Sequence, residues 1–367
     1  MLTQRPTVRH IVSPVDFQRR THRSDPLRPV RRAHILFFRL EHEPPRWKPR
    51  RRRLRAQWLA AIARTRTEVA MLILDAGPIR ASIVPEAGGI VTALDWTAPD
   101  GRRHGVLHSP HGALPSTAAP NLFGSWAMLP FANRAFGGVV DDGERRFAVP
   151  DNNPRGGGNI HGFGWQSAWT VLSSTSDRAV LEHRRSEGPD PYRYRATQEL
   201  AVDAGGLSIR LAIVNEAEET LPYGIGHHPW FPCAADTRLR LQAEGALVFG
   251  EAFRATGQTR FDDGGPYVEG PVFATGRETA WSFLGWDGTA RIETPSTGLA
   301  ITLTASETLR CPVVWAPPGA DFLCVEPQSH VIGSPSERAA REAVPLRRLA
   351  PGEALEGWLR IAPDALA

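Results

Sequence analysis

Short apolar runs separated by turn residues cover the chain from about residue 70 to its end. The runs are rich in Val, Ile, Leu and Thr and too short for helices, which favours β-strands. Gly, Pro, Asp and Asn punctuate them, as expected where the chain reverses between strands. The predicted strands are Ala70–Leu74, Ile79–Val84, Ala179–His183, Leu207–Val214, Leu247–Phe249, Ala290–Glu293, Leu299–Ala305, Val313–Ala316 and Phe322–Val325.

The residues between two apolar runs predict a hairpin. Asp203–Gly206 joins Gln198–Val202 to Leu207–Val214, and Asp and Gly are typical residues of tight turns. No amphipathic pattern of a dozen residues persists after the first 66 residues, which argues against helices. We therefore predict an all-β protein, a sandwich or barrel, with one domain over residues 67–367.

Charge is distributed unevenly along the chain. Residues 1–66 hold eighteen of the 43 Lys and Arg residues and four of the 39 Asp and Glu residues. Their net charge is therefore +14, whereas residues 67–367 carry −10, for a total of +4. The run Arg50–Arg53, scattered prolines and little apolar periodicity predict a disordered basic arm over residues 1–66, with a short helix near Arg53–Arg64.

Two interpretations of this arm stay open. Clustered arginines could bind nucleic acid or another anionic surface, because they neutralise phosphates without needing a fold. Alternatively, residues 1–66 are a mis-assigned N-terminal extension. Lys48 is the one lysine of the chain, which indicates a biased coding composition, and Met71 stands at the first predicted strand. We expect no nucleic-acid partner for the folded domain.

Composition also limits where the protein works. The chain is 41% hydrophobic and 22% charged and lacks an apolar run of about eighteen residues, so we expect no membrane partner. The apolar stretch His34–Leu40 is too short for a secretory signal. Cys233, Cys311 and Cys324 are too few and too widely spaced for a disulfide framework or for paired zinc ligands. A reducing, cytoplasmic compartment fits best.

Residues that could carry chemistry gather in four segments, each marked by Gly or Pro where a strand ends. Taken singly they are weak signals, since a histidine beside aromatic residues is usually structural and Arg134 could equally satisfy loop carbonyls. Glu326 is harder to explain, because a carboxylate in an apolar strand is costly unless it is paired or used. The segments are Leu129–Arg134, Asn159–Trp165, Tyr223–Phe231 and Cys324–His330.

Together the four segments resemble the aldose 1-epimerase (galactose mutarotase) family, in particular its bacterial branch. The matching phrases follow one another in the family's order over about residues 71–335. The resemblance implies a large antiparallel β-supersandwich of the galactose mutarotase type, in agreement with the independent all-β prediction. The phrases are Pro130–Arg134, His161–Trp165, Gly226–Phe231 and Val325–Pro327.

The resemblance also implies roles for five residues. His228 matches the family's general acid and Glu326 its general base. His161 and Arg134 match residues that contact the substrate, and Asn133, which accompanies Arg134, would add a hydrogen bond. The implied partner is a small-molecule aldose, and neither a cofactor nor a metal is implied.

These roles fit the chemistry of converting one anomer into the other. Opening the sugar ring removes a proton from the anomeric hydroxyl and delivers one to the ring oxygen, which needs a base and an acid on opposite sides of one small molecule. A glutamate and a histidine can be ionised and protonated together near neutral pH. His161 and Arg134 would stabilise charge on the ring oxygen, and Trp165 or Trp230 could stack on the sugar or pack in the core.

One position departs from the family pattern. Relatives usually have an aspartate that binds sugar hydroxyls about three residues before the phenylalanine corresponding to Phe283, and this chain has Ala280. The departure puts sugar specificity and activity in doubt. Asp262, Asp263 or Asp287 could compensate for it.

Three other functions remain as alternatives. The missing aspartate makes a non-catalytic sugar-binding protein of the same fold credible. A hexose-phosphate mutarotase would need extra basic groups, which the sequence does not place. A metal enzyme could use His161, His227, His228 and Glu326, but adjacent histidines on a strand point to opposite faces, so His227 and His228 could not both bind one ion easily.

Overall fold

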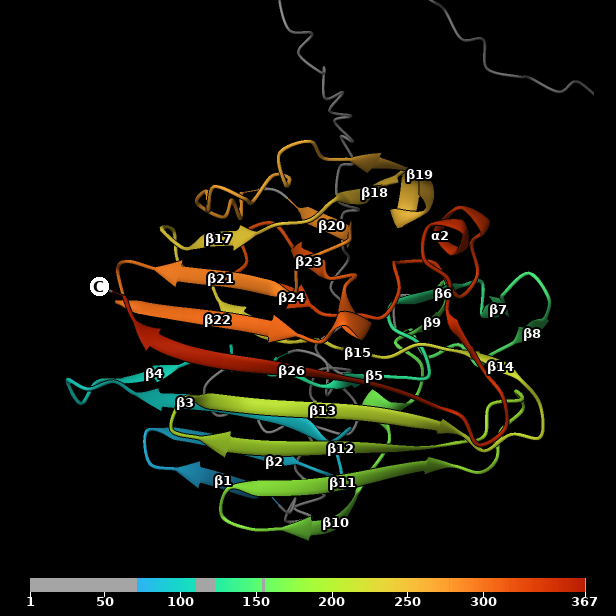
Figure 1. Ribbon diagram of the computed structural model, residues 1–367, viewed down its shortest axis with the longest axis horizontal. Coiled ribbons are helices and arrows are strands. Elements are labelled where there is room, and N and C mark those ends of the chain that lie inside the picture. The colour runs from blue at the N-terminus through green and yellow to red at the C-terminus, as the bar shows by residue number, and fades with distance from the viewer. Residues whose placement is uncertain (1–70, 110–122, 154–155, 277, 367) are drawn as a thin grey trace, which may run out of the picture. The chain divides into compact units, whose positions relative to one another are not determined.

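Antiparallel strands make up most of the computed structural model, which describes residues 71–109, 123–153, 156–276 and 278–366 (Figure 1). The helical elements of this described part are one α-helix, α2 (Arg338–Ala343), and three short 3-10 segments. The prediction of an all-β protein is confirmed. Within the same residues, no helix has the length and hydropathy that crossing a bilayer requires. The predicted basic arm and its helix lie outside the described residues.

The largest sheet contains eight antiparallel strands. In its middle strands every second side chain is buried, because successive residues of a strand point to opposite faces and one face covers the core. In spatial order the strands are β10 (Thr170–Ser174), β11 (Arg178–Arg185), β12 (Tyr194–Asp203), β13 (Gly206–Asn215), β26 (Ala354–Ala365), β22 (Leu299–Ala305), β21 (Thr289–Thr294) and β17 (Arg238–Leu241).

Strand β26, which comes last in the sequence, lies in the middle of this sheet (Figure 1). Ile361 pairs with Leu207 of β13 on one side and with Leu303 of β22 on the other. The predicted hairpin is also present, since Asp203 pairs with Gly206 across a two-residue turn. The sheet therefore combines a local hairpin with pairings between distant parts of the chain.

A six-stranded antiparallel sheet carries one half of the candidate site. Its strands, in spatial order, are β16 (Trp230–Pro232), β24 (Phe322–Glu326), β23 (Val313–Ala316), β20 (Thr279–Leu284), β18 (Gly245–Phe249) and β19 (Ala255–Arg260). A four-stranded sheet contains β1 (Leu72–Ala76), β2 (Ile79–Val84), β3 (Ile90–Thr97) and β4 (Arg103–Gly105).

Short strand pairs complete the described fold, and two of them adjoin the other half of the site. They are two or three residues long and lie in glycine-rich segments without alternating polarity, so the sequence pattern did not predict them. The pairs are β5 (Ala127–Met128) with β15 (Gly226–His227), β6 (Arg134–Phe136) with β9 (Gly158–Ile160), β7 (Val139–Asp141) with β8 (Arg146–Ala148), and β14 (Leu221–Tyr223) with β25 (Arg347–Leu349).

Candidate active site

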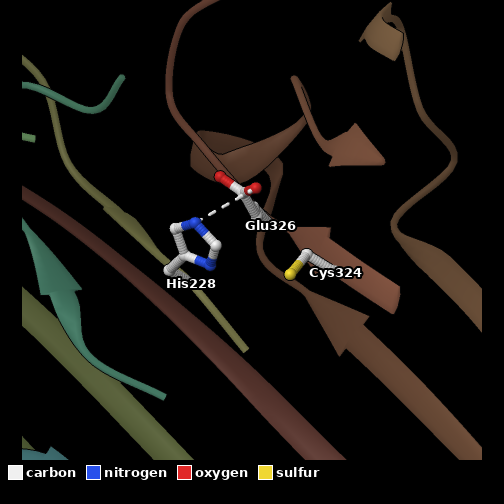
Figure 2. A group of neighbouring side chains, drawn as sticks. All are labelled: His228, Cys324 and Glu326. Carbon is white, nitrogen blue, oxygen red and sulfur yellow. Dashed lines mark ion pairs between the residues drawn. The ribbon is translucent and has the colours of Figure 1, made fainter. Parts of the chain in front are cut away.

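Glu326 and His228 meet where β24 and β16 run side by side. Trp230 of β16 pairs with Cys324 of β24, so His228, two residues before Trp230, is brought beside Glu326 at the end of β24. The Nε2 atom of His228 lies 3.3 Å from Oε1 of Glu326 (Figure 2). The amide of His228 donates to the carbonyl of Trp126, which fixes the segment ahead of β16. Strand pairing thus joins two residues almost a hundred positions apart.

Both members of the pair are removed from solvent, with exposures of 6% for His228 and 2% for Glu326. Burial lowers the pKa of His228 to about 3 and raises the pKa of Glu326 well above its ordinary value. The Gln328 side-chain amide, which donates to Oε2 of Glu326 over 3.0 Å, opposes the second shift. Burial therefore favours a neutral imidazole beside a protonated carboxyl, whereas their contact favours the ion pair. Since the two forms contain the same number of protons, they differ only in where one proton lies.

The geometry differs from the sequence-based expectation in one respect. The acid and the base were expected on opposite sides of a small molecule, but Nε2 and Oε1 face each other directly. The ring oxygen and the anomeric hydroxyl of a sugar are bonded to the same carbon. Two groups on the same side of a sugar could therefore reach both oxygens.

His161 directly follows β9, and two hydrogen bonds connect it to Asn133, which directly precedes β6. The amide of His161 donates to the carbonyl of Asn133 over 2.7 Å, and the amide of Asn133 donates to Nδ1 of His161 over 3.1 Å. Both residues are buried and have left-handed φ values of 61° and 57°. Because Nδ1 accepts a hydrogen bond, the neutral ring carries its proton on Nε2. His161 is thereby prepared to act as a hydrogen-bond donor.

His161 belongs to the same cluster as the acid–base pair. Its ring centroid lies 5.3 Å from that of His228, in an edge-to-face arrangement. Burial lowers the pKa of His161 well below its ordinary value, and the charges of His228 and Arg134 lower it further. Arg134, at the start of β6, is partly buried, and its guanidinium lies 5.9 Å from the centre of the Phe253 ring. The structure thus groups His161 and Asn133 with the pair and places Arg134 where its charge reaches His161.

Trp126 is a part of the site that the sequence analysis missed. Its ring centroid is 4.5 Å from His228 and 5.0 Å from His161. Trp230 stacks on His228 as well, with centroids 5.5 Å apart. Among the described residues, neither indole N–H of Trp126 and Trp230 has a hydrogen-bond partner. Trp126 stands four residues before Pro130, but a buried tryptophan near a motif looks the same in sequence as one in the core.

Trp165 has a structural role instead. It is 1% exposed and packs in a small cluster with Val84, Ile90 and Trp126, and its indole N–H donates to the carbonyl of Ile160. From the sequence, Trp165 and Trp230 could each stack on the sugar or pack in the core. Core packing explains Trp165. Trp230 is the one that contacts His228 directly.

Two other histidines support the site without joining it. His330 is fully buried, and its Nε2 lies 3.2 Å from the amide and 3.1 Å from the carbonyl of Ala132, just before Asn133. His227, on β15, contacts the Ser125 hydroxyl through Nδ1 over 3.2 Å. His227 ends β15, whereas His228 lies between β15 and β16, so the two are not neighbours on one strand. Their rings contact different groups, the Ser125 hydroxyl and the Glu326 carboxylate.

Two of the three aspartates that could compensate for the aspartate missing at position 280 have local structural roles. Asp287 accepts a bond from the amide of Thr289, and Asp263 accepts one from the amide of Gly265. Each therefore stabilises its own turn. Ala280 itself lies on β20 opposite Trp315 of β23.

Comparison with known proteins agrees with these features. The fold is all-β, and the buried His228–Glu326 pair lies where β16 and β24 run side by side. Residues 73–362 match the family described as Aldose 1-epimerase, and the chain therefore belongs to that family. It has the galactose mutarotase-like fold.

Individual relatives are similar over most of the described chain. The uncharacterized protein YphB of Escherichia coli K12 is 31% identical over 236 residues, which is 62% of this chain and 79% of YphB. The crystal structure of a candidate aldose 1-epimerase from E. coli K12 is 25% identical, with a TM-score of 0.70 over 81% of this chain and 99% of that one. A galactose mutarotase-like protein of Clostridium acetobutylicum is 22% identical, with a TM-score of 0.69 over 80% and 95%.

Proposed function

We propose that this protein is an aldose 1-epimerase that interconverts the α and β anomers of an aldose. The observation that carries the proposal is the contact between Nε2 of His228 and Oε1 of Glu326, 3.3 Å apart in a buried site. Membership of the aldose 1-epimerase family supports the same reaction. All three cysteines are free and buried, in keeping with a reducing cytoplasmic compartment.

The reaction starts from ionised Glu326 and protonated His228. Glu326 takes the proton of the anomeric hydroxyl, and His228 gives its proton to the ring oxygen. The bond between the anomeric carbon and the ring oxygen breaks, and the anomeric carbon becomes an aldehyde. Rotation about the adjacent carbon–carbon bond presents the other face of the aldehyde. Both proton transfers then reverse and close the ring as the other anomer.

The buried surroundings suit both stages of this cycle. With the cyclic sugar bound, the pair is a carboxylate and an imidazolium. With the open-chain aldehyde bound, it is a protonated carboxyl and a neutral imidazole, the form that burial favours. The two forms hold the same number of protons, so turnover needs no proton from solvent. Opposing preferences of burial and contact keep the two forms closer in free energy than either influence alone would allow.

The neighbouring residues receive roles that follow from their contacts. His161 would donate from Nε2 to a sugar oxygen, since Asn133 occupies its Nδ1. Arg134 would stabilise negative charge that develops on the ring oxygen, and Asn133 would add a hydrogen bond to the substrate. The rings of Trp126 and Trp230, both packed on His228, would exclude water from the proton transfers.

Polarimetry on freshly dissolved α-glucose and α-galactose tests this function. The intact chain should speed the decay of optical rotation above the buffer rate. Glu326→Gln and His228→Asn should each lower that rate by roughly 100-fold or more, since each removes one proton transfer. Unchanged circular dichroism would show that these variants fold. No acceleration with any aldose would refute the assignment.

The alanine at position 280, where relatives usually have an aspartate, favours one other function: a sugar-binding protein without catalysis. Calorimetric titration with the same aldoses separates the two. Sugar binding without any acceleration supports the binding protein, and binding with acceleration supports the enzyme.

A further inference from the structure

A third side chain lies against the acid–base pair and has no part in the proposed reaction. Cys324 and Glu326 are two residues apart on β24, so their side chains project from the same face of the strand. The pairing of Trp230 with Cys324 brings His228 to that face. The Cys324 sulfur, one ring nitrogen of His228 and one carboxylate oxygen of Glu326 all lie within 4.8 Å of one another (Figure 2). All three residues are buried.

We propose that Cys324, His228 and Glu326 form a binding site for a zinc-like divalent cation, and that the bound ion blocks the acid–base pair. Thiolate, imidazole and carboxylate are the ligands that zinc takes in proteins. A tetrahedral zinc ion separates its nitrogen and oxygen ligands by about 3.4 Å, as follows from bond lengths of roughly 2.1 Å. The observed Nε2 to Oε1 distance of 3.3 Å is close to that value.

Charge balance supports a divalent ion. A thiolate and a carboxylate together carry two negative charges, which one divalent cation neutralises. Binding breaks the S–H bond of Cys324 and releases that proton to solvent. It also displaces the proton shared between Glu326 and His228, which leaves to solvent as well, so two protons are released for each ion bound. The resulting buried cluster is neutral, so it avoids the cost of an unpaired buried charge.

The surroundings favour reversible binding over a permanent metal centre. Gln328 holds Oε2 of Glu326, which leaves Oε1 for the ion. Metal-binding histidines normally donate from their second ring nitrogen to a protein oxygen, which raises affinity. Nδ1 of His228 has no such partner among the described residues. We therefore expect zinc to bind as an inhibitor that a chelator removes.

The bound ion would block the acid–base pair because two of its ligands are the members of that pair. This part of the inference rests on the proposed function. Coordination occupies the lone pair of His228 and an oxygen of Glu326, the groups that would transfer protons. The ion would compete with the aldose, and inhibition would be strongest at low sugar concentration.

Cobalt absorption tests the site independently of activity. Co²⁺ added to the chelator-treated full-length protein should give a thiolate-to-cobalt absorption band near one equivalent, and Zn²⁺ should abolish it by displacement. The double variant Cys233→Ser/Cys311→Ser keeps Cys324 as the sole cysteine and should retain the band. Cys324→Ser should lose the band and bind Zn²⁺ at least tenfold more weakly in calorimetry. Persistence of the band in Cys324→Ser, or its loss in the sole-cysteine variant, would overturn the proposal.

Kinetics with zinc give the second measurement, each variant being compared with its own rate in chelator. Zn²⁺ should inhibit the native chain and the sole-cysteine variant at the same concentration. Cys324→Ser should need a Zn²⁺ concentration at least tenfold higher for the same inhibition. A cobalt band in a protein that accelerates no aldose would refute the proposed enzyme and leave the metal site intact. Acceleration of mutarotation without a cobalt band would refute the metal site and leave the enzyme intact.

Discussion

Gln328 donates to one carboxylate oxygen of Glu326 while His228 faces the other. This hydrogen bond lowers the pKa of Glu326 against the effect of burial. Gln328 therefore acts as a positioning residue that holds the carboxylate in place and favours its ionised form.

Replacing Gln328 by methionine tests this role. Without the bond the pKa of Glu326 rises further, so the acidic limb of the pH–rate profile should move up by about one pH unit. The maximal rate should fall as the carboxylate loses its fixed orientation. Gln198→Met is the matched control, because Gln198 is also fully buried and donates to the Gly89 carbonyl. It should lower stability without moving the limb, and equal shifts in both variants would contradict the role.

Gly162, next to His161, has a backbone conformation that only glycine adopts without strain. Its φ is +66°, and a Cβ there would come within 2.2 Å of the Leu129 carbonyl oxygen. Gly77, in the turn between β1 and β2, has a similar φ of +74°, but a Cβ added there would meet nothing within 4 Å. The two positions separate the cost of the backbone angle from the cost of the close contact.

Alanine at each position measures these costs by urea unfolding. Gly77→Ala should lose about 1 kcal/mol of unfolding free energy through the left-handed angle alone. Gly162→Ala should lose at least about 2 kcal/mol more, because the Leu129 backbone must move. It should also slow mutarotation, since His161 adjoins the displaced segment. Equal losses in the two variants would show that the contact is relieved without cost.

At the scale of elements, strands with regular alternation were predictable and the site-bearing strands were not. Ile79–Val84, Leu299–Ala305 and Val313–Ala316 are confirmed with their predicted bounds. The pairs β5–β15 and β6–β9 owe their form to tertiary contacts, because two or three residues carry no periodicity. The resemblance to a family pointed to His228, Glu326 and His161. Cys324 and Gln328 lie two residues on either side of Glu326, in a segment that the sequence singles out, but their contacts need the structure. Trp126 joins the site through its contact with His228, which sequence spacing does not reveal.

Across the whole molecule, buried neutral histidines link stability to pH. Burial lowers the pKa of His227 and His228 to about 3 and of His183 and His330 to about 4. Each of these side chains takes up a proton on unfolding when the pH lies below about 6.5. Glu326 acts in the opposite sense, because its raised pKa lets the folded state keep a proton that the unfolded state loses.

Stability should therefore fall as the pH drops from about 6.5 towards 4, because the unfolded state binds more protons over that window. Each of the four histidines contributes up to about 1.4 kcal/mol per pH unit, and Glu326 offsets part of the total above its ordinary pKa. Urea unfolding at a series of pH values measures the slope. A free energy of unfolding that stays constant between pH 6.5 and 4 would contradict the prediction.

The place of β26 has a consequence for biosynthesis. Among the described strands, β10 to β13 and the group β17, β21 and β22 are joined in one sheet only through β26. A ribosome makes β26 after all of them, so β13 and β22 each keep an unpaired edge until β26 has been made. Unpaired edges invite association with other chains. The synthesis of β26 is therefore the step at which both of these edges become paired and this route to association closes.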